Sequence, residues 1–156
     1  MPCPPKPLTE TDIIFQIGLV QEARNDFDLA RDAYERVLAD NPNHGKVLQQ
    51  LGWLFHSSQT TTVPNPDETA IRYLERSIEA DRNDPLTWYL LGRCYMSLCK
   101  YDKAYENFDS AVHKDPRNSV FWCSIGVLYY QITQFIDALN AYKMAINCNR
   151  FVPEVW

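Results

Sequence analysis

Glycine and tryptophan recur along this chain at a fixed interval, which constrains the fold more than any other feature of the sequence. Four of the five glycines are 34, 40 and 34 residues apart, and three of the four tryptophans are each 34 residues apart. These residues are Gly18, Gly52, Gly92, Gly126, Trp88, Trp122 and Trp156. A period of this length indicates a stack of supersecondary units that bury their apolar faces against their neighbours.

Four copies of the period align, at residues 11–44, 45–84, 85–118 and 119–152. The third copy carries the fullest pattern: Trp88, Leu91, Gly92, Tyr95, Ala104, Phe108, Ala111 and Pro116. Apolar residues within the copies recur at three- and four-residue spacing, which indicates amphipathic helices. The second copy holds six extra residues between its two helices, and the fourth has Arg150 where proline is expected.

This pattern resembles that of the tetratricopeptide (TPR) repeat family. The resemblance implies an all-α fold, a right-handed superhelical solenoid of antiparallel helix pairs. Glycine at the eighth position of each copy would let the two helices approach closely. The tryptophan at the fourth position and the aromatic residue at the twenty-fourth would then fill the space around them as core side chains.

Three segments lie outside the regular copies. Residues 1–10 hold four prolines and predict a flexible, Pro-rich leader. Residues 57–67 are rich in Ser, Thr and Pro and predict a surface loop, the insertion of the second repeat. Residues 153–156 match the first positions of a further repeat, so the array is expected to be truncated there.

The sequence lacks the motifs that would indicate catalysis, cofactor or metal binding, or nucleic-acid binding. The net charge is -5 and the basic residues are scattered, which argues against direct nucleic-acid binding. The five cysteines form no C-x-x-C pair, and the three histidines lie in different repeats. No nucleophile elbow, P-loop or membrane-spanning run occurs. We therefore expect no catalytic, cofactor or metal site, and a reducing compartment, either the cytosol or the nucleus.

Binding of another protein is the function that the family resemblance implies, through a concave groove lined by the first helix of each repeat. Carried over position by position, the candidates are Phe15, Leu19, Gln49, Trp53, His56, Leu86, Tyr89, Arg93, Met96, Cys123, Val127, Tyr130 and Gln131. Tyr89, Arg93 and Tyr130 are the strongest, because aromatic and Arg side chains often anchor interfaces. The Lys, Asn and Arg clamp with which some TPR proteins bind heat-shock chaperones is missing, since only Arg93 is basic among the matching positions.

Two stretches go beyond the general repeat pattern, FWCSIGVLYYQITQFIDALNAYKMAI at 121–146 and AYERVLADNPNHGKVLQQLGWLF at 33–55. They look like the TPR subunits (Cyc/Ssn) of the fungal general transcriptional corepressor, which act with a WD-repeat corepressor of the Tup type. The resemblance implies a nuclear, non-enzymatic scaffold that bridges DNA-bound repressors to that partner and to chromatin. In that family the interior repeats select repressors.

Two alternatives stay open. The stretch from Trp122 to Tyr129 is also similar to the TPR region of the UTX/UTY histone demethylases, which would make the chain the non-catalytic region of a larger enzyme. The residues YYQI at 129–132 and DPRN at 115–118 favour the corepressor. The other alternative is a general TPR adaptor with no role in transcription.

Overall fold

The computed structural model describes residues 9–57 and 64–149, and in these residues it has eight helices and no strand. The helices are α1 Glu10–Ala23, α2 Phe27–Asp40, α3 Gly45–Ser57, α4 Pro66–Ala80, α5 Pro85–Ser97, α6 Tyr101–Lys114, α7 Ser119–Gln131 and α8 Phe135–Asn149. None of these helices combines the length and the apolar character that crossing a bilayer requires.

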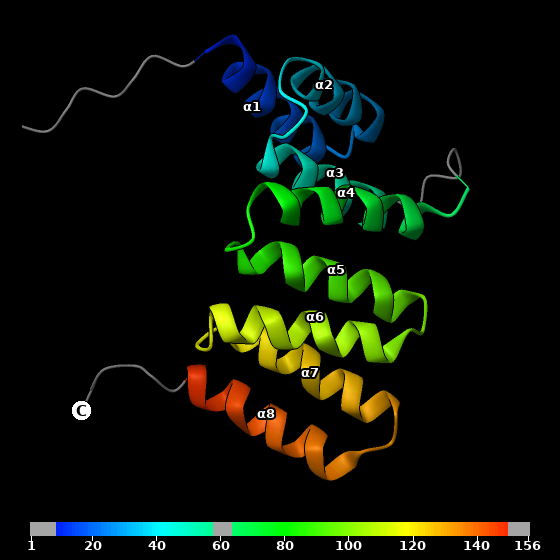
Figure 1. Ribbon diagram of the computed structural model, residues 1–156, viewed down its shortest axis with the longest axis vertical. Helices are drawn as coiled ribbons and strands as arrows, with labels where there is room; N and C mark the ends of the chain where they lie inside the picture. Colours follow the sequence, from blue (N-terminus) through cyan, green and yellow to red (C-terminus); the bar gives the residue numbers. More distant parts are fainter. Residues whose placement is uncertain (1–8, 58–63, 150–156) are drawn as a thin grey trace, which may run out of the picture.

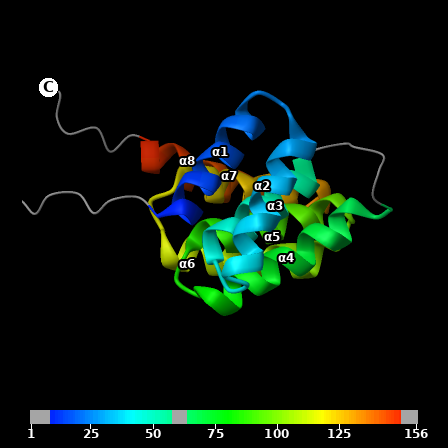
Figure 2. The same ribbon diagram turned by 90° about the horizontal axis from the view of Figure 1, so that it is seen from above.

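The helices form four pairs that stack along the long axis of the molecule, as Figures 1 and 2 show from two directions. Each odd-numbered helix makes its most extensive contacts with the helix that follows it, and α4 and α6 then contact the first helix of the next pair. Buried side chains run through all four pairs as one cluster. The predicted all-α solenoid of paired helices is therefore confirmed.

Glycine at the eighth position brings the two helices of each pair together. A Cβ atom built on Gly92 would lie 2.6 Å from the ring of Phe108, and one on Gly126 would lie 2.7 Å from the ring of Tyr142. Gly18 and Gly52 approach the matching large residues, Tyr34 and Leu74, at 2.5 Å.

Real Cβ atoms essentially never lie this close to another atom, so a larger residue at any of these four positions would force its neighbour to shift. The close approach of the two helices predicted at each recurring glycine is thus confirmed.

The tryptophans do not lie as deep as the sequence predicts. Trp88 and Trp122 are half-buried, with one side packed against the core. The indole N–H of Trp88 donates a hydrogen bond to the carbonyl of Arg82 at 3.0 Å, and that of Trp122 to Pro116 at 2.8 Å. Because a buried indole N–H requires a polar partner, each tryptophan hydrogen-bonds to the backbone of the segment that connects its repeat to the preceding one.

Tight turns within three of the pairs depend on a residue in the left-handed region. Asn25, Cys99 and Thr133 have φ values of 64°, 58° and 62°. The residue after the left-handed one donates its amide N–H to a carbonyl in the last turn of the first helix. In the turn at Cys99, for example, the amide of Lys100 donates to the carbonyl of Tyr95 at 2.9 Å. This geometry ends the first helix and reverses the chain within a few residues.

The segment boundaries expected from the sequence need two corrections. The leader was expected to run through residue 10, but Thr9 caps α1 with a capping box and Glu10 begins the helix. The insertion was expected to span 57–67, but Ser57 ends α3 and Pro66 begins α4. Residues 1–8 and 58–63 lie outside the described residues, and so do Arg150 and the start of the further repeat at 153–156.

Candidate functional site

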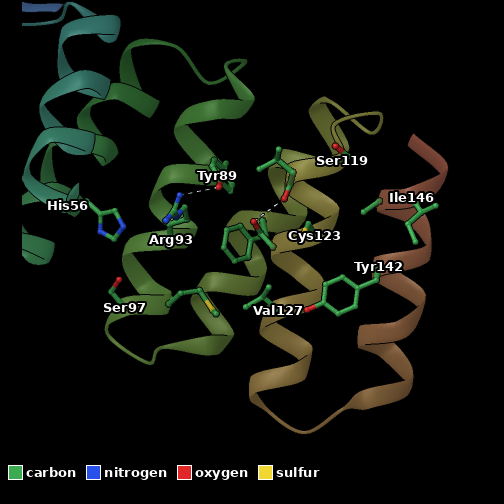
Figure 3. Close-up of a pocket in the computed structure, with 14 residues that line it drawn as sticks. His56, Tyr89, Arg93, Ser97, Ser119, Cys123, Val127, Tyr142 and Ile146 are labelled. Atoms are coloured by element: carbon green, nitrogen blue, oxygen red, sulfur yellow. Dashed lines mark hydrogen bonds between the residues drawn. The ribbon is translucent and has the colours of Figure 1, made fainter. Parts of the chain in front are cut away.

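A groove of about 840 Å³ opens between α5 and α7, with α8 on its far side (Figure 3). Six of the predicted residues line it, and they come from three first helices: His56, Tyr89, Arg93, Met96, Cys123 and Val127. A volume of this size is typical of ligand-binding clefts. The structure thus gathers three of the four third-repeat candidates and two of the four fourth-repeat candidates, together with His56, around one hollow.

Arg93 is the central polar group of the groove. Its guanidinium carbon lies 5.3 Å from the ring centroid of Trp53 and 5.8 Å from that of Tyr89. One guanidinium nitrogen donates a hydrogen bond to the Tyr89 hydroxyl at 3.3 Å. These contacts hold an exposed cation in place, since a guanidinium stacks on aromatic faces.

No ion pair among the described residues involves Arg93. Of the described residues that line the groove, it is also the only arginine or lysine. Its charge is therefore available to an anionic group brought in by a ligand, to which the planar guanidinium can donate two parallel hydrogen bonds.

The opposite side of the groove is apolar. Val120, Val127 and Ile146 line it and are 51%, 39% and 55% exposed. Tyr142 of α8 also lies along this wall, near Val127. Apolar side chains that are open to solvent beside a fixed cation suit the docking of a mixed apolar and acidic segment.

Sequence reasoning missed eight residues of the lining: Ser97, Phe108, Ser119, Val120, Ser124, Tyr142, Ala145 and Ile146. Helical spacing could have identified Val120 and Ser124, because Val120 lies three residues before Cys123 and Ser124 lies three residues before Val127. Tyr142, Ala145 and Ile146 belong to the second helix of the last repeat, which the first-helix rule excludes.

Several predicted residues lie elsewhere. Phe15 packs in the first repeat, with its ring centroid 5.9 Å from Tyr34, and Leu19 is half-buried against the core. Leu86 and Gln131 are exposed but do not line the groove. Tyr130, one of the three strongest candidates, is 59% exposed and lies beside Phe135, with 5.6 Å between ring centroids, instead of on the groove wall.

Gln49 was predicted to face a ligand, but it is only 2% exposed. Its Nε2 donates to Asp84 at 2.9 Å and to the hydroxyl of Thr87 at 2.8 Å. Lys46 donates to the same Asp84 oxygen at 2.9 Å. The amide therefore belongs to a polar network that joins the second repeat to the third, and the Gln49 side chain presents almost no surface to a ligand.

Asp84 is the central residue of this network, since both Lys46 and Gln49 donate to it. Its other carboxylate oxygen accepts from the amide of Leu86 at 3.1 Å and so caps α5. Burial raises the pKa of Asp84, but the hydrogen bonds from Lys46, Leu86 and Gln49 outweigh that effect and hold the pKa below its ordinary value.

One cluster of potential metal ligands lies in a place that histidine spacing in the sequence did not indicate. His56, Asp67 and Cys94 each place one ligand atom within 4.8 Å of the other two. They come from α3, α4 and α5 and are 11 and 27 residues apart in the chain. Spacing within one helix or loop could not reveal them, because the stacking of repeats brings them together.

Comparison with known proteins agrees with the repeat pattern. Two models of the tetratricopeptide repeat match the chain, one over residues 12–44 and one over residues 85–118. The solved structure "MamA 41-end from Desulfovibrio magneticus RS-1" superposes with a TM-score of 0.81 at 20% identity, covering 93% of this chain and 78% of that one. At this identity the likeness shows the fold alone.

Curated relatives are closer in sequence. The general transcriptional corepressor trfA of Dictyostelium discoideum is 58% identical over 83 residues, which is 53% of this chain and 6% of that protein. The general transcriptional corepressor ssn6 of Schizosaccharomyces pombe is 60% identical over 79 residues, 51% of this chain and 7% of that protein. The chain thus spans less than a tenth of the length of these relatives. This chain therefore contains tetratricopeptide repeats at 12–44 and 85–118 within an all-α solenoid of helix pairs, and over about half of its length it is similar to the general transcriptional corepressors.

Proposed function

We propose that this chain is a protein-interaction scaffold of a transcriptional corepressor, and that the groove between α5 and α7 docks segments of DNA-bound repressors. The relatives that share more than half of their aligned residues with it are general transcriptional corepressors. The repeat fold supports the same role, because stacked helix pairs present extended concave surfaces to other proteins.

The observation that carries the groove assignment is Arg93, held between two aromatic rings without an acidic partner among the described residues. The apolar wall formed by Val120, Val127 and Ile146 lies across the same hollow. A fitting ligand is a peptide segment that has an acidic side chain near one or two aliphatic or aromatic side chains. The acid would pair with Arg93 while the apolar side chains cover the exposed wall.

A nuclear location and a WD-repeat partner of the Tup type belong to the same proposal. The corepressor relatives support the nuclear location, and the family resemblance of the sequence suggests the WD-repeat partner. Neither depends on the groove, whose chemistry is satisfied by any acidic and apolar segment. A general adaptor role would use the same groove with partners outside transcription. The identity of the relatives favours the corepressor over that role and over the non-catalytic region of a histone demethylase.

Charge reversal at Arg93 tests the proposal. We expect Arg93→Glu to weaken the binding of repressor segments by at least about 30-fold, which is the loss of roughly 2 kcal/mol typical of an interface hot spot. Repressors are first captured from nuclear extract on the immobilised wild-type chain. Segments of them that bind the chain are then titrated against each variant, with the dissociation constant as the measurement.

Arg36→Glu is the matched control, because it makes the same charge change at an exposed residue of α2 that does not line the groove. It should leave the dissociation constant within about twofold, since exposed charges far from an interface contribute little. If both variants weakened binding equally, the loss would be explained by the change in net charge and not by a contact of Arg93 with the ligand. Unchanged binding by Arg93→Glu would remove the groove from the proposal, and a captured set without transcription proteins would remove the corepressor role.

A further inference from the structure

Three side chains that commonly bind metals converge from three different helices. His56 lies in the last turn of α3, Asp67 in the first turn of α4 and Cys94 within α5. The Nδ1 atom of His56 is 2.9 Å from Oδ1 of Asp67, and the Cys94 Sγ completes a group whose three ligand atoms all lie within 4.8 Å of one another. Neither a shared helix nor a shared loop forces this convergence.

The three side chains of the cluster are largely buried. Cys94 is fully buried, and the side chains of His56 and Asp67 are only 12% and 25% exposed. A cation bound here would compensate the charge of the Asp67 carboxylate and of a Cys94 thiolate in these buried surroundings.

We propose that His56, Asp67 and Cys94 bind a divalent cation of the zinc class. Imidazole nitrogen, thiolate sulfur and carboxylate oxygen are the three zinc ligand types in proteins, and a thiolate selects against Mg²⁺ and Ca²⁺. Ordinary zinc bond lengths place tetrahedral ligands roughly 3.3–3.7 Å apart. The His56–Asp67 contact would open slightly and Cys94 would move closer.

His56 also lines the groove, and a water molecule from the groove would supply the fourth ligand. Three protein ligands and one water complete a tetrahedral site. Binding converts the Cys94 thiol to a thiolate and releases its proton to the solvent. The cation would join α3, α4 and α5, and so would fix the two helices that flank the insertion to the helix that carries Arg93. This inference does not depend on the proposed function.

Cobalt(II) titration of the reduced, chelator-treated chain tests the site directly. We expect one equivalent of Co²⁺ to produce the visible bands of tetrahedral cobalt together with a thiolate-to-cobalt charge-transfer band in the near ultraviolet, and Zn²⁺ to displace it. Cys94→Ala should abolish the charge-transfer band. His56→Ala and Asp67→Asn should each weaken Zn²⁺ binding by at least about 100-fold, more than the loss of a supporting hydrogen bond to a ligand causes.

Cys123→Ala and His113→Ala are the matched controls, since both residues are exposed and lie outside the cluster. They should leave the spectrum and the Zn²⁺ affinity unchanged. Asp67→Asn preserves the size of the side chain, so its circular dichroism should match that of the wild type and separate metal loss from unfolding. A wild-type chain that gives no charge-transfer band, or a band that persists in Cys94→Ala or disappears in Cys123→Ala, would overturn the proposal.

Discussion

Phe108→Ala should destabilise the chain by about 3–5 kcal/mol, the range measured for deletion of a buried aromatic side chain. Phe108 is 1% exposed, covers Gly92 and lies 6.0 Å from the Tyr89 ring, centroid to centroid. Its loss would leave a cavity that the backbone of α5 cannot close. Chemical denaturation followed by circular dichroism measures the change, which is a large share of the roughly 5–15 kcal/mol that stabilises a typical domain.

Phe108→Tyr and Ile136→Ala are the comparisons for that result. Tyrosine already occupies the matching position at Tyr34 and Tyr142, so Phe108→Tyr should cost less than about 1.5 kcal/mol. Ile136 is 78% exposed, and its truncation should change stability by no more than about 0.5 kcal/mol. Similar losses for Phe108→Ala and Ile136→Ala would contradict the account of how each repeat is packed.

Asp84→Ala should cost about 2–4 kcal/mol at neutral pH, through two separable losses. Removing the cap of α5 accounts for roughly 1 kcal/mol. The buried Nε2 of Gln49 would also lose one of its two acceptors, which costs roughly 1–3 kcal/mol. Asp84→Asn retains an oxygen that can cap the helix, so it should be milder. Denaturation curves of the three chains measure both differences.

The effect of pH follows from the sign of the Asp84 shift. The folded-state pKa is lowered from the ordinary value of 3.8, so the ionised carboxylate stabilises the fold above that pH. This contribution is lost as the pH falls through the folded-state pKa. The stability difference between the wild type and Asp84→Asn should therefore be largest at neutral pH and shrink below about pH 4. A difference that stays constant or grows in acid would contradict the role assigned to the charge.

The sequence predicted the packing of the repeats because that packing depends on local periodicity. Gly92 and Phe108 occupy fixed positions of one repeat, so their contact follows from the 34-residue pattern. The same reasoning overestimated the burial of Trp88, because periodicity indicates which face a residue occupies but not how deep it lies. The indole instead fastens a link between repeats.

The groove could be predicted only in part, for a related reason. Tyr89 and Arg93 were found because they lie on the face of a first helix that the family uses for binding. Gln49 lies at a comparable position, yet partners from the next repeat enclose it, and a linear pattern cannot show this. The sequence did not indicate the cluster of His56, Asp67 and Cys94 for the same reason, since these residues meet only where three helices pack together.

The central claim is that the groove between α5 and α7 receives the partner protein. A photo-crosslinking amino acid in place of Val127, which lines the groove, tests this claim most directly. The same group in place of Ile136, which is exposed and does not line it, is the comparison. In nuclear extract we expect Val127 to give crosslinks to DNA-binding repressors that Arg93→Glu removes, and Ile136 to give none of them. Repressor crosslinks from Ile136 but not from Val127 would contradict the claim.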